Sequence, residues 1–304
     1  MKIFVTGATG FIGSAVVPEL IKAGHQVLGL SRSDAGAKSL VAAGAQVHRG
    51  DLTDLETLRS GATVSDAVIH TAFGHDFSKF AESCEIDGRA IETLGSELQG
   101  SERPFIVTSG TAGLAAPGQV ATEDDNIPPN FPFPRVSEQM ALALVRKGVR
   151  ASVMRLPQVH DTTKQGLVTY LIAVARQKGV SAYVGEGRNR WSAAHVLDVA
   201  RLYRLALEKH EAGAKYHAVA EEGVAMRDIA EAIGRGLKVR VVSLSPEQAQ
   251  AHFGWLSMFA SNDLQASSAQ TRRKLGWNPT GPGLIADLER LSYFAEARLS
   301  TSLR

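Results

Sequence analysis

The sequence predicts an α/β fold in which a doubly wound parallel sheet is followed by a smaller C-terminal substrate lobe. Short apolar runs alternate with segments of helical periodicity through the first 160 residues. That alternation is typical of a parallel sheet covered by helices on both faces. A glycine-rich turn directly follows the first apolar run, and the regular alternation stops after Asp161. These observations predict one sheet domain and a second region that is built differently.

Each expected strand is a short apolar run bounded by turn residues or charges. Helices are expected between the strands, where apolar residues recur at helical spacing. Pro18 lies inside the first helix and predicts a kink, and Gly24 stands where a helix commonly ends. The expected strands are residues 3–5, 26–30, 46–48, 67–70, 104–108 and 150–155, and the expected helices are residues 11–23, 36–43, 55–60, 85–98 and 137–146.

The chain after residue 160 has fewer apolar strands and more isolated helical segments. Helical periodicity appears in residues 163–179, 226–237 and 267–277, and a strand followed by a turn is expected in residues 181–191. We expect both parts to form one compact unit with a cleft between them. The predicted division is a sheet domain over residues 1–160, to which residues 191–215 return, and a smaller lobe over residues 161–190 and 216–304.

The charge balance argues against several classes of protein. The chain has 33 Lys and Arg against 31 Asp and Glu, a net charge of +2, and no run of five like charges. This composition predicts neither a nucleic-acid arm nor a basic membrane patch. The first apolar run is too short for a signal peptide, and no apolar run approaches the ~18 residues of a membrane span. A cytoplasmic protein without a membrane or nucleic-acid partner is expected.

The cysteine and histidine residues argue against a metal centre. Cys84 is the single cysteine, so neither an internal disulfide nor a cysteine metal cluster is available. The nine histidines are scattered without metal-ligand spacing. We therefore expect no metal, and we expect Cys84 to be a buried thiol. His195 and Asp198 look like a functional pair, but we interpret them as structural.

The motif VTGATGFIG places three glycines between the first expected strand and the first expected helix. Gly7 permits a tight turn, Gly10 lets the backbone approach a pyrophosphate, and Gly13 allows close packing of the helix on the strand. The start of the helix then offers unpaired N–H groups and a positive dipole end to phosphates. In this strand–turn–helix context, the motif predicts a Rossmann-type dinucleotide site.

The spacing Gly-x-x-Gly-x-x-Gly, preceded by Thr6, resembles the extended and atypical short-chain dehydrogenase/reductases, the superfamily of NAD-dependent epimerases and dehydratases. Further blocks resemble that superfamily and occur in the expected order along nearly the full length. This resemblance implies an NAD(P)-dependent enzyme that acts on a small molecule. The blocks are GDLTD at 50–54, VIHTA at 68–72, RLPQVH at 155–160, AAHVLDVA at 193–200 and TRRKLGWNP at 271–279.

The end of the second strand indicates which cofactor binds. A cofactor with a free ribose 2′-hydroxyl favours an acidic residue there. This chain has Ser31 and Arg32 instead, and an arginine can pair with a 2′-phosphate and stack on adenine. We therefore predict NADP(H) over NAD(H). Asp34 nearby keeps open the alternative that Arg32 is an ordinary exposed loop residue.

The resemblance also implies which residues contact the cofactor along its length. They are Gly7, Thr9, Gly10, Phe11, Ile12 and Gly13 at the phosphates, Ser31 and Arg32 at the ribose, Asp51 and Leu52 beside the adenine, Thr71, Ala72, Phe73 and Thr108 along the dinucleotide, and Leu156, Pro157 and Val159 near the nicotinamide. His70 is expected to be a packed histidine at the end of a strand rather than a catalyst.

The chain departs from the superfamily at its catalytic residues. Carbonyl-reducing members carry Tyr-x-x-x-Lys at the later helix, where the tyrosine donates the proton and the lysine lowers its pKa. Alignment by the start of the helix puts Pro134 and Glu138 at those two positions. The usual hydroxyl position falls on Gly110, between Ser109 and Thr111. The chain therefore resembles the atypical branch, which keeps the fold but lacks the standard catalytic set.

Four residues are candidates to replace the missing groups: Ser109, Thr111, Arg135 and His160. A histidine near the nicotinamide can donate a proton near neutral pH, whereas an arginine stabilises an oxyanion but is a poor acid. Alternatives remain open, because His160 is equally suited to a structural role and Arg135 to a pair with Glu138. Tyr170 or Tyr183 from the smaller lobe is a further candidate, and Ser137 is expected to cap a helix.

Three functions remain open at this point. The first is an NADP-dependent oxidoreductase that reduces a carbonyl-like group with a substituted proton donor. The second is an epimerase, isomerase or dehydratase with transient hydride transfer, in which Arg188 or Arg190 holds an anion. The third is a cofactor-sensing protein without turnover. Family dimers pair through helices that correspond here to residues 85–98 and 137–146, so a homodimer is an open expectation.

Overall fold

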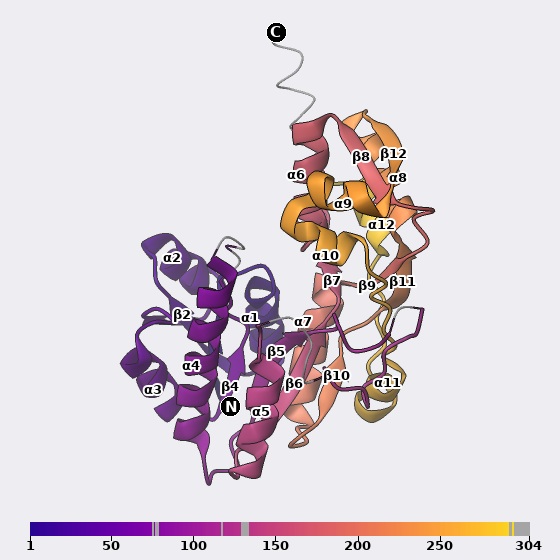
Figure 1. The fold of residues 1–304 in the computed structure, drawn as a ribbon. Coiled ribbons are helices and arrows are strands. Elements are labelled where there is room, and N and C mark those ends of the chain that lie inside the picture. The colour runs from indigo at the N-terminus through magenta and orange to yellow at the C-terminus, as the bar shows by residue number, and fades with distance from the viewer. Residues whose placement is uncertain (75, 77–78, 117, 129–133, 292–293, 295–304) are drawn as a thin grey trace.

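The computed structural model describes residues 1–74, 76, 79–116, 118–128, 134–291 and 294. Figure 1 shows a lower region built around a large sheet and an upper region of smaller sheets and helices. None of the helices in these ranges combines the length and apolar character needed to cross a bilayer. Within the same ranges, no three His, Cys, Asp or Glu side chains are placed to share a metal ion.

The lower region contains a seven-stranded sheet in the order β10-β6-β5-β4-β1-β2-β3, and all its paired strands run parallel. The prediction of a doubly wound parallel sheet is therefore confirmed. The order reverses at β1, whose neighbours are β2 and β4, and ligands of such sheets bind at this switch point. The strands are β1 Lys2–Thr6, β2 Gln26–Ser31, β3 Gln46–Arg49, β4 Ala67–His70, β5 Phe105–Gly110, β6 Ala151–Leu156 and β10 Lys215–His217.

Helices cover both faces of this sheet, and a separate apolar core lies between the sheet and the helices on each face. One core joins β1 to α1 Gly13–Lys22, α2 Asp34–Ala42 and α7 Val196–Glu208. The opposite core joins the sheet to α3 Leu55–Thr63, α4 Phe80–Leu98 and α5 Ser137–Arg146. Successive residues of β1 divide between the two cores, since Ile3 and Val5 belong to the first and Phe4 to the second. This double burial explains why the strands are apolar throughout rather than alternating.

The upper region contains a three-stranded sheet in the order β11-β9-β7 and a two-stranded sheet of β12 and β8. A third apolar core lies between these sheets and their helices. The strands are β7 Gln158–His160, β8 Val180–Val184, β9 Arg190–His195, β11 Glu221–Ala225 and β12 Arg240–Leu244. The helices are α6 Val168–Lys178, α8 Met226–Leu237, α9 Pro246–Phe253, α10 Ser257–Ala260 and α12 Leu284–Glu289, with a 3-10 turn at Gly254–Leu256.

The sheets place three strands differently from the predicted division. β7 lies before residue 161, and nearly all of β9 lies within residues 191–215, yet the two strands pair with each other in the upper region. β10 lies after residue 215 in part, yet it extends the large sheet beside β6, and α11 Ala269–Leu275 packs against it and against α7. Each strand joins its sheet by pairing with a strand that is distant in the sequence. Local periodicity carries no information about such distant partners.

The segment between β5 and α5 connects the two regions. Its residue Gly118 donates its amide to Asp263 at 3.2 Å, and Ala121 forms a β-bridge with Ala266. Glu123 accepts hydrogen bonds from the amide and the hydroxyl of Thr271, at 2.7 and 2.8 Å. These contacts fix the described part of the segment before the chain reaches α5, where the expected catalytic helix begins.

Candidate active site

The glycine loop has the geometry that a dinucleotide requires. Gly7 adopts φ +66°, and a Cβ on it would lie 2.6 Å from the amide nitrogen of Ala72. A Cβ on Gly13 would lie 2.1 Å from the carbonyl oxygen of Gly7. Only glycine avoids both the conformational strain and these contacts. The loop is therefore a tight backbone cradle between β1 and α1.

The amides of this cradle are available to an anion. The N–H groups of Phe11 and Ile12 donate to no backbone carbonyl in the described ranges, and the first turn of α1 carries no acidic residue. Such a helix start combines free donors with a positive dipole end. The cradle and its free amides fit the pyrophosphate of a nicotinamide dinucleotide, whose nicotinamide would supply or accept the hydride when bound.

The predicted ribose site is partly formed at the end of β2. Ser31 is buried and donates its hydroxyl to the carbonyl of Ser33 at 3.0 Å. Arg32 is 82% exposed, and its nearest carboxylate is that of Asp51 at 3.9 Å. Ser33 caps α2 by accepting the amide of Gly36 at 3.1 Å. Arg32 is therefore a weakly held cation beside a helix start.

The predicted dinucleotide contacts continue along the carboxyl edge of the sheet. Thr71 is tied to the end of β1, because its hydroxyl donates to the carbonyl of Thr6 at 2.8 Å. Asp51 accepts the amide and hydroxyl of Thr53, each at 3.0 Å. Leu156, Pro157 and Val159 lie where β6 passes into β7. The fold thus brings these residues to one edge.

A buried hydrogen-bond chain, which we name the Asp87 chain, runs between the ends of β1, β4 and β5. It consists of Thr6, His70, Asp87, Ser137, Arg135 and Thr108. Thr6 Oγ1 lies 2.7 Å from His70 Nδ1, and His70 Nε2 lies 3.1 Å from Asp87 Oδ1. Ser137 donates to Asp87 Oδ2 at 2.5 Å and accepts the Nε–H of Arg135 at 2.8 Å. Arg135 also donates through Nη2 to the carbonyl of Thr108 at 3.0 Å.

The donors and acceptors of this chain fix its direction. The Ser137 hydroxyl donates its one proton to Asp87, so its oxygen accepts the Nε–H of Arg135. A carboxylate accepts from His70 Nε2–H, and the Thr6 hydroxyl then donates to Nδ1. Burial raises the pKa of Asp87, but the hydrogen bond from His70, the charge of Arg135 and the Ser137 hydroxyl outweigh burial and lower it. Asp87 is therefore a buried carboxylate.

Arg135 is the cationic member of the Asp87 chain and lies beside a residue that is predicted to contact the dinucleotide. Its guanidinium lies 4.1 Å over the ring of Phe73, a residue predicted to line the dinucleotide. Burial lowers the pKa of Arg135, and the nearby groups Asp87, Cys84 and Tyr203 oppose that shift. Its Nη1 has no hydrogen-bond partner in the part of the chain that the structure describes. A fixed guanidinium with one unused donor nitrogen can donate a hydrogen bond to an oxygen atom of a ligand.

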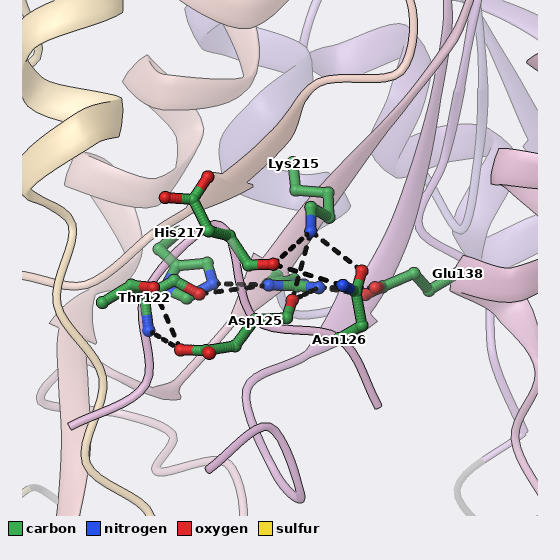
Figure 2. A network of polar contacts seen from close by, with 8 residues as sticks. Thr122, Asp125, Asn126, Glu138, Lys215 and His217 are labelled. Carbon is green, nitrogen blue, oxygen red and sulfur yellow. Dashed lines mark hydrogen bonds and ion pairs between the residues drawn. The ribbon is translucent and has the colours of Figure 1, made fainter. Parts of the chain in front are cut away.

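The residue at the lysine position of the superfamily lies elsewhere. Glu138 forms a buried two-pronged ion pair with Arg155, at 2.5 and 2.8 Å. Arg155 donates in turn to Nε2 of His217 at 3.0 Å and to the carbonyl of Asp125 at 2.7 Å (Figure 2). The alternative that Arg135 pairs with Glu138 is therefore wrong, since the phase of α5 turns Glu138 toward β6. No lysine-like role is left for position 138.

Both predicted hydroxyl residues are buried near the end of β5. Ser109 pairs in register with Arg155 on β6. Thr111 places its hydroxyl 3.4 Å from that of Ser192 on β9, so it lies where the two regions meet. The structure thus keeps two hydroxyls beside Gly110, one on the sheet and one toward the upper region.

The structure places His160 apart from the Asp87 chain. His160 is completely buried in β7, and its Nδ1 lies 2.7 Å from Asp287 of α12. Its ring contacts that of His195 with centroids 5.9 Å apart. Burial lowers the pKa of His160, and the hydrogen bond and charge of Asp287 oppose the shift. These contacts join β7, β9 and α12 within the upper region.

The other candidates from the smaller lobe lie on its helices and turns. Tyr170 packs edge-on against Trp255, with centroids 5.2 Å apart, and Tyr183 lies beneath the guanidinium of Arg227 at 5.7 Å. Arg188 is 85% exposed and pairs with Glu186 at 2.8 Å. That pair favours the interpretation of Arg188 as a solvated arginine. Three further aromatic residues of the sequence, Phe77, Phe131 and Phe133, lie outside the described residues.

Asp87 and the link through Ser137 were not predicted as site residues. A signal for Asp87 does exist in the sequence. Asp87 shares one face of its helix with Ala90, Ile91 and Leu94, at the spacing that marks a buried face, and all four are buried. A carboxylate on such a face needs hydrogen-bond partners, which marks it as a candidate for function.

Comparison with known proteins agrees with this fold. The model of the NAD dependent epimerase/dehydratase family matches residues 3–220. The chain belongs to this family. The NAD-dependent epimerase/dehydratase family consists of nicotinamide-dependent enzymes, and the chain is an enzyme of this kind.

Two relatives cover nearly the whole chain, and a third covers 70% of it. An uncharacterized protein of Schizosaccharomyces pombe is 50% identical over 97% of this chain and 100% of its own length. An uncharacterized protein of Saccharomyces cerevisiae is 47% identical over 95% of this chain and 98% of its own. The 2-alkyl-3-oxoalkanoate reductase of Stenotrophomonas maltophilia is 29% identical over 70% of this chain and 67% of its own.

Solved structures of the family share the fold. The Thermus thermophilus UDP-glucose 4-epimerase, in complex with NAD, has a TM-score of 0.74 at 20% identity and covers 98% of this chain and 99% of its own. The dTDP-glucose 4,6-dehydratase DesIV of Streptomyces venezuelae, with NAD bound, has a TM-score of 0.77 at 20% identity and covers 99% of this chain and 98% of its own. At this identity, the likeness concerns the fold alone.

Proposed function

We propose that this NAD-dependent epimerase/dehydratase-family enzyme reduces a carbonyl group of a small molecule with NADPH. In this proposal Arg135 donates a hydrogen bond to the carbonyl oxygen. The observation that carries the proposal is the unused Nη1 of a guanidinium held by Ser137 and the Thr108 carbonyl. The Arg135 guanidinium lies at the carboxyl edge of the sheet, where the family places its cofactor. A fixed donor of this kind stabilises the negative charge that develops on oxygen during hydride transfer.

The chemistry then needs a proton for the resulting alkoxide. Arginine is a poor acid, so Arg135 stabilises the charge but does not deliver the proton. Ser109 and Thr111 are the hydroxyls nearest the usual position, and we assign one of them to relay a proton to the oxygen. His160 is kept out of the reaction, because it is completely buried against Asp287.

The preference for NADPH rests on the end of β2. Ser31 and Arg32 stand where NAD-binding proteins favour a carboxylate, and Arg32 is exposed and weakly paired. The guanidinium can move a short distance to a 2′-phosphate without breaking a strong ion pair. Asp51, at 3.9 Å, is the group that would compete with that phosphate.

The experiment is a panel of aldehydes and ketones assayed with NADPH and with NADH, using the wild-type enzyme and the variants Arg135→Gln and Asp198→Asn. Asp198 is a buried aspartate of α7 that accepts backbone amides of Thr280 and Gly281, so its variant controls for general loss of a buried charge. We expect kcat to fall about 100-fold to 1000-fold in Arg135→Gln and to stay near wild type in Asp198→Asn.

The same panel distinguishes the alternatives. Product formation from a sugar nucleotide without net oxidation of the cofactor would support an epimerase or dehydratase, the activities that the names of several similar proteins give. Cofactor binding without turnover of any compound would support a sensor. Full activity of Arg135→Gln would refute the assigned role of Arg135.

A further inference from the structure

The charges around Arg135 cancel within the described part of the site. Asp87 is 1% exposed and carries one negative charge. The Ser137 hydroxyl links it to Arg135, because it donates to Asp87 at 2.5 Å and accepts the Nε–H of Arg135 at 2.8 Å. Two other titratable groups near the guanidinium stay neutral. Burial raises the pKa of Cys84 to about 11, and burial also raises that of Tyr203. One cation therefore faces one anion.

This balance has a consequence for the ligand at Nη1 of Arg135. A carboxylate bound there would lose its hydration, and Asp87 would offset much of the attraction of the guanidinium. A neutral carbonyl oxygen has no such charge to desolvate, yet it still receives the N–H of a polarised donor. We propose that Asp87 is a specificity-determining residue that makes the Arg135 site select uncharged carbonyl compounds over carboxylates. This inference rests on the proposed function, because that function places the substrate oxygen at Arg135.

Two substitutions separate the charge of the Asp87 chain from its geometry. Asp87→Asn removes the charge but keeps the hydrogen bonds, since Asn Oδ1 accepts from Ser137 and Asn Nδ2 donates to His70. His70 adapts by moving its proton to Nδ1, which then donates to Thr6 Oγ1, 2.7 Å away. Ser137→Ala keeps the charge but removes the link to Arg135. The first variant therefore tests selectivity and the second tests positioning.

The test measures binding of two probes of the same shape, benzoate and benzamide, by calorimetry. The protein is saturated with the oxidised nicotinamide cofactor that it binds more tightly. We expect the wild-type protein to bind benzamide more tightly than benzoate. In Asp87→Asn, benzoate affinity should rise about tenfold or more while benzamide affinity stays within about threefold. The double variant with Arg135→Gln should lose that gain, and Ser137→Ala and Asp198→Asn should not show it.

Several outcomes would overturn the inference. Unchanged benzoate affinity in Asp87→Asn would do so, and so would a gain that survives removal of Arg135, because the anion would then bind elsewhere. Tighter binding of benzoate than of benzamide by the wild-type protein would also contradict it, even where the variant fails to fold. The binding result needs no turnover. Full activity of Arg135→Gln in the carbonyl panel would therefore count against the proposed function separately.

Discussion

At the scale of single residues, Arg32 is the side chain that tests the cofactor preference. Replacing it with alanine removes the charged donor expected at the 2′-phosphate, which contributes about 1.5–3 kcal/mol when bonded to a charged group. We expect Arg32→Ala to weaken NADPH binding by about tenfold to 100-fold and to leave NADH binding almost unchanged, as measured by fluorescence titration. Arg49→Ala is a nearby control, since Arg49 pairs with Asp34 at 2.8 Å. Equal losses for both cofactors would contradict the assignment.

Also at this scale, Thr111 and Ser109 compete for the role of proton relay. General acid catalysis by a positioned group contributes about 100-fold to 10,000-fold. We expect one of Ser109→Ala and Thr111→Val to lower kcat within that range, and the other to have a small effect. The solvent isotope effect on kcat should rise in the same variant, because proton transfer then limits the rate. If neither variant alters kcat, the proton comes from another group.

At the scale of elements, the contact between α5 and β6 depends on a buried ion pair. Glu138→Lys would restore the residue type of the superfamily but would place a second cation against Arg155, which is completely buried. Breaking a buried pair costs about 3–5 kcal/mol, because a charge is left without its partner. We therefore expect a fall in the free energy of unfolding of that size in urea denaturation, instead of a gain of activity.

The matched control for this element is an ion pair on the surface. Glu186 pairs with Arg188 at 2.8 Å, and both side chains are mostly exposed. Such pairs contribute roughly 0–1 kcal/mol, so Glu186→Lys should change the unfolding free energy by no more than that. A similar cost for both substitutions would show that the burial of the Glu138–Arg155 pair is unimportant.

At the scale of the whole molecule, buried neutral histidines predict sensitivity to acid. His217 accepts from Arg155 at Nε2 and contacts the Ser267 carbonyl through Nδ1 at 2.8 Å, so it must be neutral in the fold. Burial, aided by the charge of Arg155, lowers its pKa to about 4. Burial and the charge of Arg150 likewise lower the pKa of His210 to about 4.

The sign of the effect follows from proton uptake. Below pH 6.5 the unfolded chain binds protons at these histidines and the folded chain does not, so stability is full above that pH and is lost as the pH falls toward 4. We expect each histidine to contribute a loss on the order of 3 kcal/mol over that window. His217→Gln should reduce the slope of unfolding free energy against pH but not abolish it, because His210 remains. An unchanged slope would contradict this account.

The sheet domain and the phosphate cradle could be predicted from the amino-acid sequence. Both depend on neighbours in the chain: apolar runs form the strands, and the glycine spacing allows Gly7 to take φ +66° and Gly13 to approach the Gly7 carbonyl. The missing tyrosine and lysine were equally visible, since Pro134 and Glu138 occupy their positions. The set of strands in the seven-stranded sheet was only partly predictable from the sequence. β10 joins this sheet by pairing with β6, which is distant from it in the chain.

The tertiary structure alone decided how the polar groups pair. Ser137 and Asp87 are 50 residues apart, and only the packing of α4 against α5 brings the hydroxyl to the carboxylate. The phase of α5 likewise turns Glu138 toward Arg155 and leaves Arg135 with the Asp87 chain. Local periodicity records which face of a helix is buried, but a buried charge is partnered by whatever side chain the packed neighbour presents. The charge balance at the candidate active site is therefore a property of the fold.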